Sequence, residues 1–240
     1  MKEGKSRHRA VFWGVTVGGV LITAAVISLY TPGLRLLDLR EIVVAGNRYT
    51  SAAEVATAAG LRAGVSLLAI SPRSVSDRVG TLPWVKAAMV RRIYPHRLSI
   101  RVEERIPVAA VLLEGGEALT IGDGGVIVEA GERPDLPRVD GAALSGDRPG
   151  GYLLDRRVID LIDSLAFDTR LRGVDIRRID VSDPASVVLY AADGPRILLG
   201  GLEGIAARLD ELAALSRTID LGSYESIDLR FKGEATLVRR

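Results

Sequence analysis

The hydrophobic and polar positions divide the chain into one long apolar run and a series of short alternating segments. Residues 10–30 contain no charged side chain. A helix of that length rises about 30 Å, which matches the hydrocarbon core of a bilayer. Trp13 and Tyr30 stand near its two ends, and amphipathic rings favour the headgroup region. The pattern therefore predicts a transmembrane helix over residues 10–30.

Two other interpretations of this run stay open. A buried core helix can be equally apolar, although such helices are usually shorter. A cleavable signal peptide would also begin with a basic segment such as residues 1–9, but its apolar region spans only about 7–15 residues and an Ala-x-Ala site follows it. The long run and the lack of that site favour an uncleaved anchor. Within it, Gly14 and Gly18 form a small-xxx-small pair that could seat another helix.

Charge sets the orientation expected for this anchor. Four basic residues precede the apolar run and only two follow it within ten residues: Lys2, Lys5, Arg7 and Arg9, then Arg35 and Arg40. The positive-inside bias then makes residues 1–9 a cytoplasmic tail. We expect lipid around residues 10–30, a linker at residues 31–38, and the bulk of the chain outside the cytoplasmic (inner) membrane.

Residues 39–107 show the periodicity of a compact α+β unit. Ser51 and Glu54 form a capping box, which predicts the start of a helix, and Pro72 suits the first position of a second helix. Leu98, Ile100 and Val102 alternate with polar residues and predict a half-buried strand. The expected elements are a strand at 40–44, helices at 52–59 and from 72 to before 83, and strands at 85–90 and 98–103.

Residues 108–240 read as a mostly antiparallel β-domain with two helices. Gly122–Gly125 is a turn between two strands and not a phosphate loop, because the Lys-Ser/Thr pair that holds phosphate and magnesium is missing. The expected strands are 108–113, 119–121, 126–128, 174–181, 187–191 and 196–199, with helices around 158–165 and 205–215.

The end of the chain predicts a strand with one wet face. Over residues 226–233, apolar side chains alternate with charged ones, namely Ile227, Leu229 and Phe231 with Asp228, Arg230 and Lys232. Taken from the residues alone, the alternation favours a solvated outer face over a binding surface.

Composition excludes several classes of function. The 240 residues carry 32 Lys+Arg against 30 Asp+Glu, a balance too even for a dedicated nucleic-acid binder. Cysteine is absent and only His8 and His96 are present, which leaves no thiolate nucleophile and argues against a zinc site. No catalytic motif of the common hydrolases, zinc proteases or nucleotide enzymes occurs. We therefore expect no enzymatic activity, no cofactor, no metal, no nucleic acid and no small-molecule substrate.

Five short motifs occur in an order that resembles one protein family. They are Val44-Ala-Gly46-Asn47, Gly60…Gly64…Leu67, Leu82-Pro83-Trp84-Val85, Tyr94-Pro95, and Val102-Glu-Glu104-Arg105-Ile-Pro107-Val-Ala109. Behind a single N-terminal anchor, they resemble the bacterial division protein family FtsQ, called DivIB in Gram-positive bacteria. The resemblance implies a POTRA domain at residues 39–107 and an FtsQ-type β-domain at residues 108–240.

The same resemblance implies a function and a binding site. A family member would act as a single-pass scaffold at the division septum and would hold FtsB-like and FtsL-like partners by strand addition. Arg230 would then suit an acidic residue of the partner. The residues implied are Ile227, Asp228, Leu229, Arg230, Phe231, Lys232, Gly233, Ala235 and Leu237. Two alternatives stay open, a POTRA-bearing protein of envelope assembly or secretion and a membrane-tethered enzyme with an unrecognised site.

Overall fold

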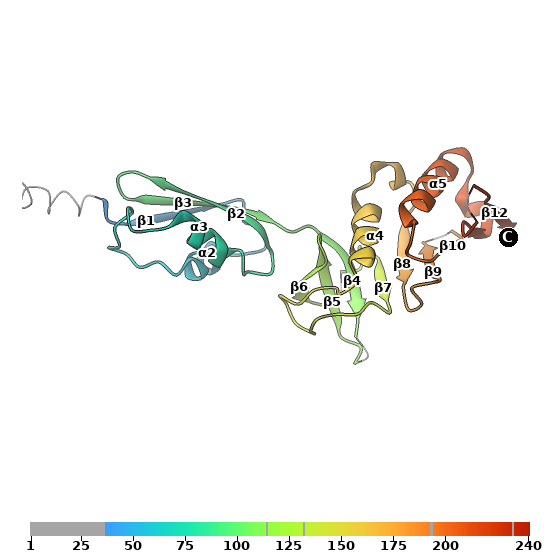
Figure 1. The fold of residues 1–240 in the computed structure, drawn as a ribbon, viewed down its shortest axis with the longest axis horizontal. Coiled ribbons are helices and arrows are strands. Elements are labelled where there is room, and N and C mark those ends of the chain that lie inside the picture. Colours follow the sequence, from blue (N-terminus) through green and yellow to red (C-terminus); the bar gives the residue numbers. More distant parts are fainter. Residues whose placement is uncertain (1–36, 114, 132, 193, 232) are drawn as a thin grey trace, which may run out of the picture. The chain divides into compact units, whose positions relative to one another are not determined.

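The computed structural model describes residues 37–113, 115–131, 133–192, 194–231 and 233–240. These residues form two compact units, and each is considered by itself (Figure 1). The first unit comprises residues 37–80 and 87–103, and the second comprises residues 81–86 and 104–240. The expected cytoplasmic tail, the transmembrane helix at 10–30 and most of the linker at 31–38 lie outside the described residues. Within the described part, no helix is long and apolar enough to cross a bilayer.

The first unit is a three-stranded sheet with two short helices. Along the chain its elements are β1 (Glu41–Ala45), α2 (Ala52–Ala59), α3 (Pro72–Val79), β2 (Val85–Ile93) and β3 (Arg97–Glu104). The strand order is β1-β3-β2, and β1 runs parallel to β3. The predicted order of strand, helix, helix, strand and strand is confirmed, although β2 and β3 are longer than expected and α3 already ends at Val79.

Local sequence signals explain where both helices begin. The Ser51 hydroxyl accepts the Glu54 N–H at 3.1 Å, and the Glu54 carboxylate accepts the Ser51 N–H at 2.7 Å, so two N–H groups that lack helical partners are satisfied. In α3, Pro72 occupies the first turn and the Ser71 hydroxyl accepts the Ser74 N–H. Both predicted helix starts are confirmed.

The sheet of the first unit has one buried and one open face. Leu98, Ile100 and Val102 of β3 are buried as predicted. The alternate residues of β2 and β3 point the other way, and Met89 and Ile93 expose about half of their surface there (53% and 45%). A shallow hollow on this face is lined by Met89, Arg91, Ile93, Ser99 and Arg101.

The second unit is built on one nine-stranded sheet. Its strands are β4 (Pro107–Leu112), β5 (Ala118–Gly122), β6 (Val126–Ala130), β7 (Arg138–Asp140), β8 (Ile176–Asp180), β9 (Val187–Ala191), β10 (Arg196–Gly200), β11 (Tyr224–Asp228) and β12 (Thr236–Arg239). They are arranged in the order β12-β11-β10-β9-β8-β7-β4-β5-β6. Five of the eight pairings are antiparallel, and the β4–β7, β7–β8 and β10–β11 pairings are parallel. The predicted α+β class and the mainly antiparallel β-domain are confirmed.

Two helices contribute their apolar stripes to the core of this sheet. They are α4 (Arg156–Phe167) and α5 (Ile205–Thr218), and both are labelled in Figure 1. Leu161 of α4 and Leu212 of α5 are fully buried in the same cluster as the strand residues. Both helices were predicted from the spacing of their apolar residues. Helix α4 extends two residues beyond the predicted range at each end, and α5 begins as predicted and extends three residues beyond Leu215.

A buried carboxylate ties several segments of the second unit together. Asp123, in the turn between β5 and β6, is only 5% exposed. Its carboxylate accepts the Lys86 ammonium at 2.6 Å and the Ile106 N–H at 2.8 Å, while Arg105 donates to its carbonyl oxygen. A buried charge needs such partners, so the predicted turn at Gly122–Gly125 has a structural role as the anchor of residues 86 and 105–106.

Two expectations about the strands were wrong. Strand β7 was not predicted, because Val139 is its only buried residue and its charged neighbours Arg138 and Asp140 bond to each other at 2.9 Å. The strand expected over residues 226–233 already ends at Asp228. The chain then turns and returns as β12, so the end of the chain is a hairpin.

Gly46 provides a test of the first unit's packing. Its φ is +87°, and a Cβ atom there would overlap the carbonyl oxygen of Val102. Gly64 has a similar φ of +84° but open space around it. We predict that Gly46→Ala lowers the free energy of unfolding by more than the roughly 1–2 kcal/mol that a left-handed alanine costs at Gly64.

Denaturant unfolding of the full chain, followed through the transition of the first unit, measures both variants. Gly64→Ala is the matched control, because it carries the backbone strain without the overlap. Equal losses for the two variants would contradict the close approach of Gly46 to β3.

Candidate partner-binding edge

The two edges of the nine-stranded sheet differ in how their backbone groups are satisfied. At the β6 edge, the Ile127 N–H donates to the Gly151 carbonyl at 2.8 Å, and the Gly150 N–H donates to the Ile127 carbonyl at 2.9 Å. Tyr152 adds a bridge to Val126. The chain after β7 therefore covers the β6 edge. At the other edge, no backbone group of the described residues pairs with the outer side of β12.

The register of β12 identifies the groups that face outward. The Arg240 N–H donates to the Ser223 carbonyl, and Val238 and Thr236 pair with Ser226 and Asp228 of β11. Backbone groups alternate in direction along a strand, so the N–H and C=O groups of Leu237 and Arg239 point away from β11. These are the groups that an added strand would bond.

The turn before β12 is held on helix α5. The Gly233 N–H donates to the Glu211 carboxylate of α5 at 3.1 Å, and the Glu234 N–H donates to the Phe231 carbonyl. Gly233 has a φ of +77°, a conformation that glycine adopts without strain. The position of the edge strand is therefore fixed by a helix of the same unit.

Arg230 is bonded within its own hairpin. Its guanidinium donates to both carboxylate oxygens of Asp228 at 2.9 and 2.6 Å, and its N–H donates to the same carboxylate. The side-chain hydrogen bond from Arg230 lowers the pKa of Asp228. The same Asp-x-Arg arrangement recurs at Asp155–Arg157 and Asp168–Arg170. The pair is thus a local turn-forming unit, and a partner's carboxylate would have to share the Arg230 guanidinium with Asp228.

The structure does not present the sequence-predicted site residues as one surface. Ile227 and Leu229 are fully buried, and Leu237 packs its side chain against the core. Phe231 was expected on the same apolar face, but it lies in the turn and is 61% exposed. Gly233 and Ala235 are exposed beside it, and Lys232 lies outside the described residues. The side chains of Ile227 and Leu229 are therefore inaccessible to a partner.

Sequence reasoning missed three residues of the edge itself. Thr236 and Val238 are exposed on β12, and Arg239 lies over the Tyr224 ring. Arg240 donates to the Gly194 carbonyl. Arg239 and Arg240 together make the end of the strand positively charged. The available signal was the run Thr236–Val238 after Gly233, since a short strand after a glycine turn is typical of a hairpin.

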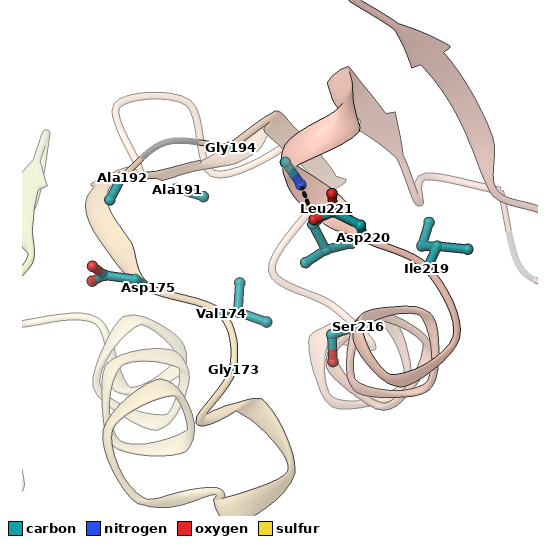
Figure 2. A pocket seen from close by; sticks show the side chains of 11 residues that line it. Gly173, Val174, Asp175, Ala191, Ala192, Gly194, Ser216, Ile219, Asp220 and Leu221 are labelled. Atoms are coloured by element: carbon teal, nitrogen blue, oxygen red, sulfur yellow. Dashed lines mark hydrogen bonds between the residues drawn. The ribbon is translucent and has the colours of Figure 1, made fainter.

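Two hollows of the second unit have no histidine, lysine or cysteine among the described residues that line them. Figure 2 shows the first, a hollow of about 340 Å³ lined largely by backbone and small residues. Its carboxylate Asp220 accepts the Gly222 N–H, drawn as a dashed line, and Asp175 pairs with Arg177. A second hollow, of about 400 Å³ near the end of α4, is mainly apolar. Across the described ranges, no three metal-ligating side chains gather.

Two family models match the chain. Residues 37–105 match a POTRA domain of FtsQ type, and residues 109–230 match the C-terminal region of the cell division protein FtsQ/DivIB. The second match ends at Arg230, so β12 lies beyond it.

Similar proteins include cell division protein FtsQ from three bacteria. The protein of a Geobacter species is 30% identical over 204 residues, which are 82% of this chain and 74% of that protein. The Mycobacteroides abscessus protein is 28% identical and covers 93% of this chain and 72% of its own length. The Mycobacterium tuberculosis protein is 31% identical over 81% of this chain and 60% of its own length.

Because Asp228 is bonded to Arg230, we expect the contribution of this pair to the free energy of unfolding to depend on pH. Because the folded-state pKa of Asp228 is lowered, the pair stabilises the fold above the unfolded pKa of about 3.9, and this contribution is lost as the pH falls through the lower folded value. We predict that Asp228→Asn lowers the free energy of unfolding by about 1 kcal/mol at pH 7.

Urea unfolding at pH 7 and at pH 3 measures the difference between Asp228→Asn and the natural chain. The difference should be full at pH 7 and smaller at pH 3. Asp147→Asn serves as the control, since the Asp147–Arg148 pair is 3.6 Å long and largely exposed. A loss that is the same at both pH values would contradict the assignment.

Proposed function

Because the chain belongs to the FtsQ/DivIB family of cell division proteins, we propose that it is a non-catalytic, membrane-anchored scaffold of the division machinery. In this proposal, residues 1–9 form a cytoplasmic tail, residues 10–30 cross the inner membrane and residues 31–38 form the linker. The POTRA domain at 39–107 and the β-domain at 108–240 lie outside the membrane and are concentrated at the division septum.

The β-domain recruits FtsB, together with FtsL, by adding a strand of the partner to β12. One observation carries this proposal, namely that the β6 edge is covered by its own chain while the outer side of β12 has no partner among the described backbone groups. Exposed edges are usually blocked in soluble proteins, and an open edge whose turn is hydrogen-bonded to α5 suits strand addition.

The chemistry of the edge limits the partner strand. The outward N–H and C=O groups of Leu237 and Arg239 supply the hydrogen bonds, and exposed Val238 and Phe231 supply apolar contacts. Arg239 and Arg240 place positive charge at the end of the strand. The proposed partner is therefore an extended segment with apolar side chains and at least one acidic residue. Ile227 and Leu229 support the edge from the core rather than touch the partner.

Replacement of one backbone donor tests strand addition directly. Arg239→Pro removes an N–H that faces away from β11, and proline is tolerated on an edge strand when its missing N–H faces outward. Arg239→Ala keeps that N–H and removes only the side chain. We predict that Arg239→Pro lowers capture of the co-expressed FtsB–FtsL pair by at least about tenfold, while Arg239→Ala changes it much less.

Pull-down from solubilised membranes with the full chain measures capture, and thermal unfolding confirms that each variant is folded. Full capture by folded Arg239→Pro would overturn strand addition at β12. An equal loss in both variants would assign the contact to the Arg239 side chain and likewise contradict backbone pairing.

A further inference from the structure

The hairpin tip of the first unit lies beside the point where the chain enters that unit. The Arg40 N–H donates to the carbonyl of His96, in the turn between β2 and β3, at 2.9 Å. In the register of the sheet, Glu41 at the start of β1 pairs with Arg97 at the start of β3. Figure 1 shows the same arrangement, with the β2–β3 turn at the end of the unit where the described chain begins.

A second loop flanks the same point. The Leu39 N–H donates to the Val65 carbonyl at 2.8 Å, and the Gly64 N–H donates to the Leu39 carbonyl at 3.0 Å. The Arg92 side chain, near the hairpin tip, donates to the Ile70 carbonyl beyond this loop. The loop at residues 61–68 and the β2–β3 turn therefore both surround residues 37–41.

Both segments expose large apolar side chains at this end. In the hairpin, Ile93 is 45% and Tyr94 is 55% exposed, and in the loop, Val65 is 37% and Leu68 is 52% exposed. Four such side chains around one point are more than the scattered single apolar residues of an ordinary surface. Tyrosine in particular favours the boundary between water and lipid headgroups.

Basic residues accompany these apolar side chains. Arg40, Arg62 and Arg91 are exposed and have no ion-pair partner among the described residues. The acidic residues of the segment that enters the unit are Asp38 and Glu41, and Glu41 is paired with Arg97 at 2.6 Å. The excess charge of this end is therefore positive, as on surfaces that meet anionic lipid.

We propose that this end of the first unit is a membrane-contact surface, in which Val65, Leu68, Ile93 and Tyr94 enter the headgroup region and Arg40, Arg62 and Arg91 bind the phosphates of anionic lipids. The inference rests on the proposed membrane anchoring of residues 10–30. With eight linker residues of at most about 3.6 Å each, residue 39 stays within about 30 Å of the bilayer. A linker of this length allows the surface to touch the lipid headgroups. Apolar and basic side chains that occur together are typical of segments that bind at the membrane interface.

The absence of cysteine from the sequence allows a direct test. A fluorophore on Tyr94→Cys of the full chain would report on the hairpin tip in vesicles of phosphatidylcholine with and without phosphatidylglycerol. Ala53→Cys is the control site, because it is exposed in the first turn of α2, which the chain reaches after the far end of β1 at Ala45. Iodide quenches labels in water, and nitroxide-bearing lipids quench labels at the headgroups.

We expect the label at residue 94, but not at residue 53, to be protected from iodide and quenched by the nitroxide lipid, more strongly with phosphatidylglycerol. Adding Arg40→Glu and Arg91→Glu should shift the label toward water. The ratio of membrane-bound to free hairpin should fall by at least about fivefold for each arginine, because a basic residue contributes about 1 kcal/mol at an anionic surface.

Three results would overturn the proposal. If the chain floats with the vesicles while the label at residue 94 remains open to iodide, the contact is wrong although the anchor is right. If the chain does not float, the anchoring of residues 10–30 is wrong and the contact falls with it. If protection appears only after a division partner is added, the surface binds protein instead of lipid.

Discussion

Each β-strand carries backbone N–H and C=O groups on two sides, and both sides need hydrogen-bond partners. The arrangement of the second unit depends on how its strands meet this requirement. Within the nine-stranded sheet, each inner strand is satisfied by two neighbours, and β6 at one edge is satisfied by residues 150–153 of its own chain. Within this sheet, β12 is the strand with a side that no backbone group of the described residues pairs. An unpaired edge invites association, so a protein that keeps one either associates through it or risks aggregation. The chain covers the edge at β6 with its own residues 150–153 but leaves the edge at β12 uncovered by any described residue. This contrast is the reason for proposing β12 as the site of association.

For the proposed strand addition, the order of the edge matters as much as its openness, because a frayed strand would have to be ordered when a partner binds. The hairpin is held at its turn by the hydrogen bond from Gly233 to Glu211, where β11 meets the turn by the Asp228–Arg230 pair, and beneath by buried Ile227 and Leu229. If a partner strand adds to β12 as proposed, these contacts hold β12 in place beforehand and so remove part of the entropic cost of association. The Asp228–Arg230 pair and the bond from Gly233 to Glu211 thus act on the position of the strand.

Much of the fold follows from the sequence, because periodicity and capping act over a few residues. The capping box at Ser51, proline at position 72 and the alternation around Ile100 place three elements where the structure has them. The hairpin at the end of the chain was missed because the alternation of Ile227, Leu229 and Phe231 continues through the turn. The strand ends where the local Asp228–Arg230 pair begins a turn. The turn is also bonded to α5 through residue 233, and a window of a few residues does not contain that second contact.

The proposed binding edge is hard to find in a sequence for a further physical reason. Strand addition uses backbone N–H and C=O groups that every residue except proline supplies, so such an edge constrains the identity of its residues only weakly. Motifs mark the opposite situation, where one side chain is required, as glycine is at residue 46 beside the Val102 carbonyl. The strongest signals in this chain therefore describe how it folds. The groups proposed to bind lie on β12, just past the end of the matched family region at Arg230.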